Sequence, residues 1–201
     1  MWWWLEDKQK LLTHKNITIM KKILVVIMII LVNMANAQEH LRFKGAQING
    51  SFDTFVTELE KRGCTSGENV FGTFLIKADF AGIEMLVYPQ TTSQTKTVYA
   101  VVAGTDGIEE EVSLIAQYNE LKNLLTQKYG EGKETTLPDG WYRNSINNIE
   151  RGNACSSLLF ENDKGRIYLY IHEENFKSSI NVQYIDKINE QLKIKESQMD
   201  I

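Results

Sequence analysis

The sequence predicts an α+β domain in which two helices pack on one face of an antiparallel β-sheet. Two segments carry apolar residues at helical spacing, and each has one apolar face that must be buried. Around them lie short runs in which apolar and polar residues alternate, separated by turn-forming residues such as glycine, asparagine and aspartate. Laying both helices on one side of an antiparallel sheet buries all of these apolar faces.

Ahead of this domain, residues 20–37 have the order of a secretory signal peptide. Two lysines precede an unbroken apolar run over residues 23–32, and a small-x-small sequence follows it. The run holds ten residues, whereas a helix that spans a bilayer needs roughly 20. We therefore expect cleavage between Ala37 and Gln38 and release into the periplasm or the extracellular space, with membrane contact only during export.

Residues 1–19 fit no part of such a signal, because they combine three tryptophans with mixed charges. Met20 followed by two lysines is an ordinary translation start, so we interpret residues 1–19 as a spurious extension. The alternative is a genuine N-terminal arm with an uncleaved anchor. The residue directly after Ala37 is glutamine rather than cysteine, which argues against a lipid anchor at the cleavage site.

Residues 38–201 have the size of one domain and an acidic balance. They number 164 and hold 17 basic and 24 acidic side chains, a net charge of −7. A chain of this length buries roughly two thirds of the surface of its unfolded state. Because it contains no basic run, it is a poor candidate for binding nucleic acid or anionic lipid.

Both cysteines, Cys64 and Cys155, lie in this domain, and an exported protein sits where disulfides persist. One bridge would close a loop of 91 residues. Chain entropy assigns such a loop about 4–5 kcal/mol of stabilisation. The alternative is two separate buried thiols that pack as small apolar residues. Neither cysteine has the neighbours of a nucleophile, and the sequence does not choose between the two states.

The first half of the domain begins with a strand at Leu41–Lys44 and a helix at Ser51–Arg62. Asn49-Gly50-Ser51 supplies a turn and a helix cap, and Gly63 ends the helix. The helix repeats apolar residues at i, i+3, i+4 and i+7, namely Phe52, Phe55, Val56 and Leu59.

Three strands are predicted next. The first covers Val70–Phe80, and its inward face comprises Phe74, Ile76, Ala78 and Phe80. A tight reversal at Ala81-Gly82 leads into Ile83–Tyr88, which ends before Pro89. Thr97–Ala103 is rich in β-branched residues and is expected to be the central strand.

The second half opens with the longest helix, Glu109–Tyr129. Three glutamates occupy its first turn, where the helix dipole favours negative charge, and Gly130 ends it. Its buried stripe is expected to comprise Leu114, Ile115, Tyr118, Leu121, Leu124, Leu125 and Tyr129.

The chain closes with a predicted meander of three strands, Cys155–Glu161, Arg166–His172 and Ser179–Tyr184. Residues 186–201 are predicted to form a polar tail with a short, fraying helix from Ile188. Both halves thus have a strand, a helix ended by glycine and then antiparallel strands, an order that indicates a tandem repeat.

Six separated stretches resemble a set of uncharacterised exported proteins of gut anaerobes, whose opening has the form L-x-F-K-G-x-x-I-[DN]-G. The stretches are residues 41–50, Phe55–Gly63, Lys77–Gly82, Tyr118–Gly130, Gly165–Leu169 and Gln183–Asn189. Asn49 stands where aspartate is usual in that set. The resemblance implies export and carries no known activity.

Residue types that perform catalysis or bind metals are sparse in this domain. It has two histidines, His40 and His172, and lacks the ligand clusters of zinc and calcium sites. It also lacks a phosphate-binding loop and a serine in the setting of a nucleophile. We therefore expect neither metal nor cofactor. The enzymatic alternative is a small hydrolase or glycan-processing accessory that uses carboxylates such as Asp79 or Glu84.

One group of aromatic and basic residues favours binding. It consists of Tyr168, Tyr170 and His172, which share a strand face, with Trp141, Tyr142 and Arg143 near them in sequence. If the helices leave this face open, it is an aromatic platform for a protein or glycan partner, and otherwise it is a second packing layer.

The leading hypothesis is an exported, non-enzymatic interaction protein of the cell envelope. The predicted αββ-type repeat resembles, at the level of fold alone, secreted β-lactamase-inhibitor proteins and small outer-membrane assembly lipoproteins, which are binding proteins. An assembly or structural role at the outer membrane is therefore a further alternative. The sequence carries no signal for the oligomeric state.

Overall fold

The structure is a computed structural model that describes residues 39–68, 74–108, 110–135, 157–174 and 177–199. Within these ranges it confirms the α+β class, with three helices, an eight-stranded antiparallel sheet and a separate two-stranded sheet. In chain order the elements are β1 (Arg42–Phe43), β2 (Ala46–Gln47), α2 (Phe52–Glu60), β3 (Thr65–Glu68), β4 (Phe74–Phe80), β5 (Ile83–Thr91), β6 (Val98–Gly104), α3 (Glu111–Tyr129), β7 (Lys133–Thr135), β8 (Ser157–Asn162), β9 (Gly165–Glu174), β10 (Lys177–Asp186) and α4 (Lys187–Met199).

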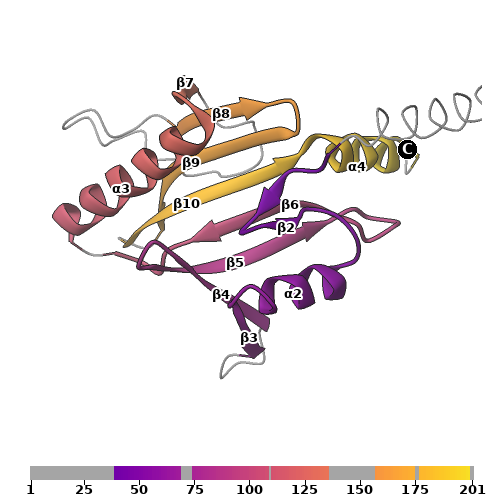
Figure 1. The fold of residues 1–201 in the computed structure, drawn as a ribbon, viewed down its shortest axis with the longest axis horizontal. Helices are drawn as coiled ribbons and strands as arrows, with labels where there is room; N and C mark the ends of the chain where they lie inside the picture. Colours follow the sequence, from indigo (N-terminus) through magenta and orange to yellow (C-terminus); the bar gives the residue numbers. More distant parts are fainter. Residues whose placement is uncertain (1–38, 69–73, 109, 136–156, 175–176, 200–201) are drawn as a thin grey trace, which may run out of the picture. The chain divides into compact units, whose positions relative to one another are not determined.

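The large sheet joins two meanders of four strands each. Its order is β3-β4-β5-β6-β10-β9-β8-β7, and all neighbours are antiparallel. In the chain α2 precedes the first meander and α3 the second, so a helix followed by four strands occurs twice. The meanders meet where β6 pairs with β10, at the centre of the sheet (Figure 1). Sequence analysis missed β3 and β7, because short polar strands lack alternation and depend on their partner strand.

The helices α2 and α3 bury their apolar sides in one core with the inward residues of the strands. Figure 1 shows α3 beside the second meander and α2 beside the first. The buried helix residues are Phe55, Val56 and Leu59 of α2, and Leu114, Tyr118, Leu121 and Leu125 of α3. Ser51 caps α2 as predicted, by accepting a hydrogen bond from the Thr54 N–H at 3.3 Å.

The predicted stripe and start of the longer helix need correction. Leu114, Tyr118, Leu121 and Leu125 follow one line at about 100° per residue. Ile115 and Leu124 fall off this line, and each is 38% exposed. The helix begins at Glu111 with Glu110 as its N-cap residue, so one glutamate, rather than three, lies in its first turn. Glu109 lies outside the described residues.

Leu41–Lys44, predicted as a strand of the main sheet, instead contributes to a separate hairpin. There β1 pairs with β2 through a turn at Lys44 and Gly45, both with positive φ. Phe43 is fully buried, and its ring centroid lies 5.3 Å from that of Phe80 in β4 and 5.2 Å from that of Tyr184 in β10. The hairpin thus packs on side chains from both meanders, on the core side of the sheet.

The β4–β5 hairpin forms where it is predicted. Ala81 and Gly82 have φ of 52° and 88°, and the Gly82 N–H donates to Asp79 Oδ1 at 3.2 Å. The inward face of β4 is confirmed at Ile76 and Ala78, which are buried, but Phe74 at the start of the strand is 41% exposed. However, β5 continues through Pro89 to Thr91. Pro89 lies beyond the last residue of β5 that pairs with β4, an edge-like position where a proline costs little.

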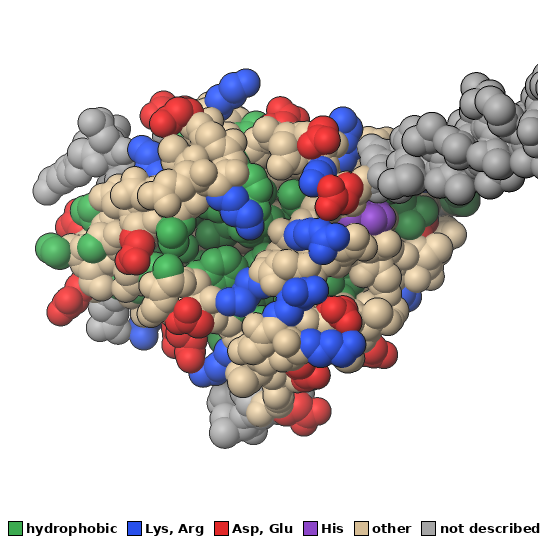
Figure 2. All heavy atoms as spheres, in the orientation of Figure 1, with side chains coloured by type: hydrophobic (Ala, Val, Ile, Leu, Met, Phe, Trp, Pro, Cys, Tyr) green, Lys and Arg blue, Asp and Glu red, His purple; other side chains and the backbone are tan. Residues whose placement is uncertain are grey.

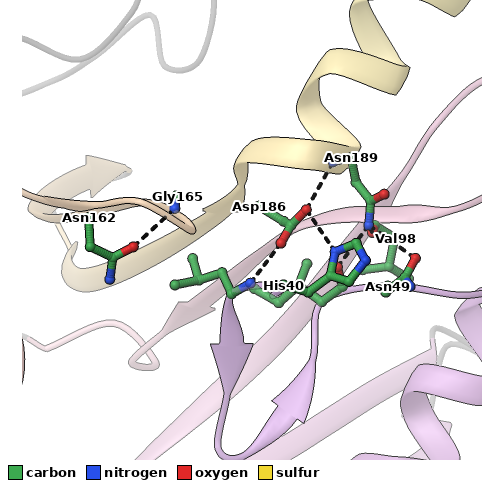
Figure 3. Close-up of polar contacts among 9 residues, drawn as sticks. His40, Asn49, Val98, Asn162, Gly165, Asp186 and Asn189 are labelled. Atoms are coloured by element: carbon green, nitrogen blue, oxygen red, sulfur yellow. Dashed lines mark hydrogen bonds and ion pairs between the residues drawn. The ribbon is translucent and has the colours of Figure 1, made fainter. Parts of the chain in front are cut away.

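The helix predicted from Ile188 forms as α4, but it has 13 residues and contacts β6, β9 and β10 rather than fraying as a tail. Its buried side chains are Asn189 and Glu196, both polar. Asn189 Nδ2 donates to the carbonyl oxygens of Ile48 at 2.9 Å and Val98 at 3.1 Å (Figure 3). The helix was predicted but its docking was not, because its buried side chains are polar and give no apolar stripe.

The far end of α4 is also fixed by polar contacts. The Glu196 carboxylate accepts hydrogen bonds from the Gln94 N–H at 2.6 Å and from the Thr95 hydroxyl at 2.6 Å. Lys193 Nζ lies 5.3 Å from the ring centroid of Tyr99 in β6. Helix α4 therefore joins the β5–β6 loop to the end of β10. None of the described helices combines the length and hydropathy that crossing a membrane requires.

Figure 2 shows the face that carries α2, α3 and the β1–β2 hairpin. Acidic and basic side chains are interspersed over it, and hydrophobic side chains reach the surface in the hollow between α3 and the hairpin.

Candidate functional site

The aromatic residues of β9 lie on the sheet face opposite the main core, as their alternation predicts. Tyr168 and Tyr170 are 4% and 3% exposed and belong to a second hydrophobic cluster with Tyr99, Ala100 and Ile185. Their rings are packed and are not an open platform. His172 is half-buried at the end of the same row. Trp141, Tyr142 and Arg143 lie outside the described residues.

The carboxylates suggested for catalysis lie on the surface of a hairpin. Asp79 and Glu84 are cross-strand neighbours in the β4–β5 hairpin, and both are exposed. Asp79 accepts a hydrogen bond from the turn, and Glu84 Oε1 lies 2.9 Å from Lys77 Nζ in a surface ion pair. A glycosidase needs two carboxylates on opposite sides of a bound sugar, and this hairpin does not provide that geometry.

Cys64 is buried with a free thiol. Burial raises the pKa of this thiol, although the nearby Lys44 ammonium opposes the shift. A buried thiol in these surroundings is inert. Cys64 is not bridged in the structure, and Cys155 lies outside the described residues.

A groove of about 420 Å³ opens on the second face of the sheet. Its floor and walls come from β5, β6, β10, the end of β9 and the segment that leaves β6. The lining residues are Leu86, Tyr88, Val102, Gly104, Thr105, Asp106, Gly107, His172, Lys177, Ser179 and Asn181. Small-molecule sites have volumes of about 300–1,000 Å³, so this groove has the size of a ligand site. We refer to these eleven residues as the β5–β10 groove.

A glycine in the middle of a cross-strand row lets a neighbouring side chain lie across the floor of the groove. Gly104 pairs with Leu86 on one side and with Asn181 on the other. The Asn181 side chain lies over the place that a Cβ at position 104 would occupy. The Asn181 Nδ2 also donates to the Ser179 hydroxyl at 3.1 Å, which orients the amide along the floor.

The end wall is the segment that connects β6 to α3, and hydrogen bonds fasten it to β10. The Ile180 N–H donates to the Thr105 hydroxyl at 3.0 Å, and the Thr105 N–H donates to the Ile180 carbonyl at 3.0 Å. One step further, the Ile108 N–H donates to the Ser178 carbonyl at 2.7 Å. These bonds hold Asp106 and Gly107 at the mouth of the groove.

A second glycine allows the wall and β10 to approach closely. A Cβ at Gly107 would lie 2.8 Å from Cδ and 2.9 Å from Cβ of Lys177, so a larger residue would displace that side chain. The aliphatic stem of Lys177 therefore packs against Gly107, and Lys177 as a whole is exposed.

The polar groups of the groove are balanced in charge. Asp106 is exposed, and its Oδ1 accepts a hydrogen bond from the Gly107 N–H at 2.8 Å. Tyr88 on the opposite wall is 44% exposed. Partial burial raises the pKa of Tyr88, and the Asp106 carboxylate adds to the shift. With Lys177 opposing Asp106, the lining carries no net charge when His172 is neutral.

A second hollow, of about 290 Å³, lies between the β8–β9 turn and α4. An ion pair between Arg166 and Glu190 crosses it. Its other lining residues include Lys187 and Gln191, so long polar side chains dominate it. The β5–β10 groove is the stronger candidate because it combines an aliphatic floor, an exposed aromatic ring and convergent polar groups.

The described ranges hold no cluster of three or more histidine, cysteine, aspartate or glutamate side chains that could bind a metal ion. No protein-family model, curated protein or solved structure matches the chain. The assignment of the site therefore depends on the groove itself.

Of the groove residues, His172 was a predicted site residue, whereas Tyr88, Asp106, Lys177 and Asn181 were not predicted from the sequence. One signal was present in the sequence. Alternation along β5 places Leu86 and Tyr88 on the face that points away from the main core, and a large exposed side chain such as Tyr88 is a candidate for ligand contact. Asp106 lies between the strand predicted at Thr97–Ala103 and the helix predicted from Glu109, and only the pairing of β6 with β10 shows it beside a groove.

Proposed function

We propose that this protein is an exported, non-enzymatic binding protein of the cell envelope, and that its ligand site is the β5–β10 groove. The single observation that carries the proposal is the composition of the groove: Leu86 and Val102 form an aliphatic floor beneath the exposed ring of Tyr88, and polar side chains surround it. Such a mixture binds and orients a ligand without supplying reactive groups.

A binding role is favoured over catalysis by the placement of the perturbed carboxylates. The pKa of Glu58 is lowered by its hydrogen bond and ion pair with Lys61, on the surface of α2. The pKa of Glu196 is lowered where it anchors α4. Catalytic carboxyl groups have shifted pKa values inside a cleft, whereas these two lie outside the groove.

Two sequence expectations support the envelope location. The signal-like segment at residues 20–37 directs export, and the resemblance to exported proteins of gut anaerobes agrees with it. The doubled order of one helix and four strands is compatible with the analogy to β-lactamase-inhibitor proteins. Because no solved structure matches the chain, that analogy concerns the order of elements alone.

Export is tested by N-terminal sequencing and intact mass of the protein recovered from the envelope or medium. We expect the first residue to be Gln38. Recovery of a chain that still begins at Met1 or Met20 would contradict cleaved export.

The groove is tested by photo-crosslinking in the native envelope. A benzophenone amino acid replaces Tyr88 in one variant and Phe74 in the control, because Phe74 is 41% exposed but belongs to β4 outside the groove. We expect a discrete adduct from position 88 that is absent from position 74, identified by mass spectrometry. The same adducts from both positions, or none from position 88, would count against a ligand site in the groove.

A further inference from the structure

The location of the groove on the face of the sheet restricts what it can recognise. β6, β10 and β9 each have a paired strand on both sides, so their backbone N–H and C=O groups are engaged in the sheet. An extended peptide binds by strand addition only at an open sheet edge. A ligand in this groove must therefore be held by side chains.

The side chains offer two kinds of surface close together. Tyr88 presents a ring that is 44% exposed, beside the aliphatic Leu86 and Val102. Across from them, Thr105, Asp106, Ser179 and Asn181 supply hydroxyl, carboxylate and amide groups. Together these groups both donate and accept hydrogen bonds. The matching ligand has an apolar face and a rim of hydroxyl groups.

The charges restrict the ligand further. Asp106 at the mouth repels a polyanion, and Lys177 on the adjacent strand repels a polycation. The lining therefore suits an uncharged ligand better than one of high charge. The space beside Gly104 and Gly107 is taken by the side chains of Asn181 and Lys177, so a ligand ring would meet these side chains and Tyr88 rather than bare backbone.

We propose that the β5–β10 groove binds a neutral saccharide unit, with a sugar ring against Tyr88 and its hydroxyl groups hydrogen-bonded to Asp106 and Asn181. A pyranose has both the apolar C–H face and the hydroxyl rim that the two walls require. This inference rests on the proposed binding function and adds the class of ligand.

The test uses ¹⁵N-labelled protein, recovered from the envelope after expression of the full chain, and amide NMR spectra. The probes are maltohexaose, cellohexaose, xylohexaose and N-acetylglucosamine hexamer, with oligogalacturonate as a charged saccharide and a hexapeptide pool as the peptide arm. We expect at least one neutral saccharide to shift amide signals of groove residues such as Val102, Thr105 and Ser179, in a saturable manner.

Two substitutions remove the inferred contacts. Tyr88→Ala removes the ring and Asp106→Asn removes the carboxylate, and each is expected to raise the dissociation constant about tenfold or more. The controls are Phe74→Ala, of similar exposure, and Asp163→Asn, in the β8–β9 turn at the opposite end of β9 from His172. Both controls should retain the affinity of the unaltered protein, and melting curves establish that all four variants fold.

The results separate the ligand class from the binding function. If the peptide pool or only the charged saccharide shifts the groove signals, the neutral saccharide is wrong while the groove remains a binding site. If no neutral saccharide shifts them, the ligand class is likewise overturned, and the crosslinking at position 88 decides the function on its own. Saccharide binding that survives both Tyr88→Ala and Asp106→Asn would overturn the inference as well.

Discussion

The buried carboxylate of Asp186 accepts a hydrogen bond from the backbone N–H of Leu41 at 2.7 Å, across 145 residues of sequence. The same carboxylate accepts the Asn189 N–H at 2.9 Å, at the start of α4, and lies 3.1 Å from His40 Nδ1 (Figure 3). Asp186 therefore holds the first described residues of the domain, the end of β10 and α4 together. Its side chain is fully buried.

Replacing Asp186 by alanine is expected to lower the free energy of unfolding by about 3–5 kcal/mol, because it leaves buried N–H groups without an acceptor. Urea unfolding followed by circular dichroism measures the change. The matched control, Asp163→Ala, alters an exposed turn residue and should change the free energy by less than about 0.5 kcal/mol. Equal losses in the two variants would contradict the anchoring role of Asp186.

The Glu196 anchor predicts a dependence of stability on pH. Burial alone would raise the pKa of Glu196, but hydrogen bonds from the Thr95 hydroxyl and from the Gln94 and Thr95 N–H groups lower it to about 2, from an ordinary value of 4.5. A pKa lowered by folding contributes stability that is fully present above the unfolded-state pKa and is lost as pH falls towards the folded-state pKa. The stabilisation is thus present above pH 4.5 and disappears between there and pH 2.

The substitution Glu196→Gln tests this dependence. At neutral pH the unaltered protein should be more stable than the variant, and the difference should shrink as the pH is lowered from about 7 to about 3. Urea midpoints at intermediate pH values measure it. Glu68→Gln, at an exposed site in β3, is the control and should leave the pH profile unchanged. If the stability of Glu196→Gln changes with pH in parallel with that of the unaltered protein, Glu196 is not the cause of the pH dependence.

Gly165 begins β9 and faces the backbone of β10. A Cβ at this position would collide with the carbonyl oxygen of Ile185 and would also lie 3.2 Å from Leu41 Cδ2. Gly165→Ala should therefore destabilise the protein by about 1–3 kcal/mol, the usual cost of overpacking. A Cβ at Gly67 in β3 meets nothing within 4 Å. Gly67→Ala should leave the thermal midpoint unchanged or raise it slightly. If both variants lose stability to a similar extent, the cause is the lost backbone freedom of glycine rather than the contact with Ile185.

The thiol of Cys64 should react slowly in the native protein. It is 5% exposed, and burial raises its pKa, so little thiolate is accessible. In a Cys155→Ser background, alkylation by iodoacetamide should be at least about tenfold slower in buffer than in urea, as measured by mass spectrometry. A cysteine introduced at Val112, which is 82% exposed, with both natural cysteines replaced, should label rapidly in buffer. Equal rates at the two sites would contradict the burial of Cys64.

Features that depend on neighbouring residues were predictable. The Ser51 cap, the buried face of α2 and the Ala81-Gly82 turn arise from contacts within a few positions along the chain. The side-chain parity of Tyr168 and Tyr170 was also correct, because alternation is a property of the strand itself. Alternation assigns a side chain to a face of the sheet but does not indicate whether that face is covered. In the structure it is covered at these two positions, because both rings are buried.

Sequence alone determined the α+β class, the two amphipathic helices and most of the strands, because hydrophobic periodicity and turn chemistry act over short distances. Only the tertiary structure decided that the β1–β2 segment leaves the main sheet, that α4 docks through Asn189 and Glu196, and that Tyr88 and Asp106 flank one groove. These outcomes depend on contacts between residues far apart in the chain. Asp186 is the clearest case, since a polar residue at the start of an apparent tail becomes fully buried once Leu41 and Asn189 donate hydrogen bonds to it.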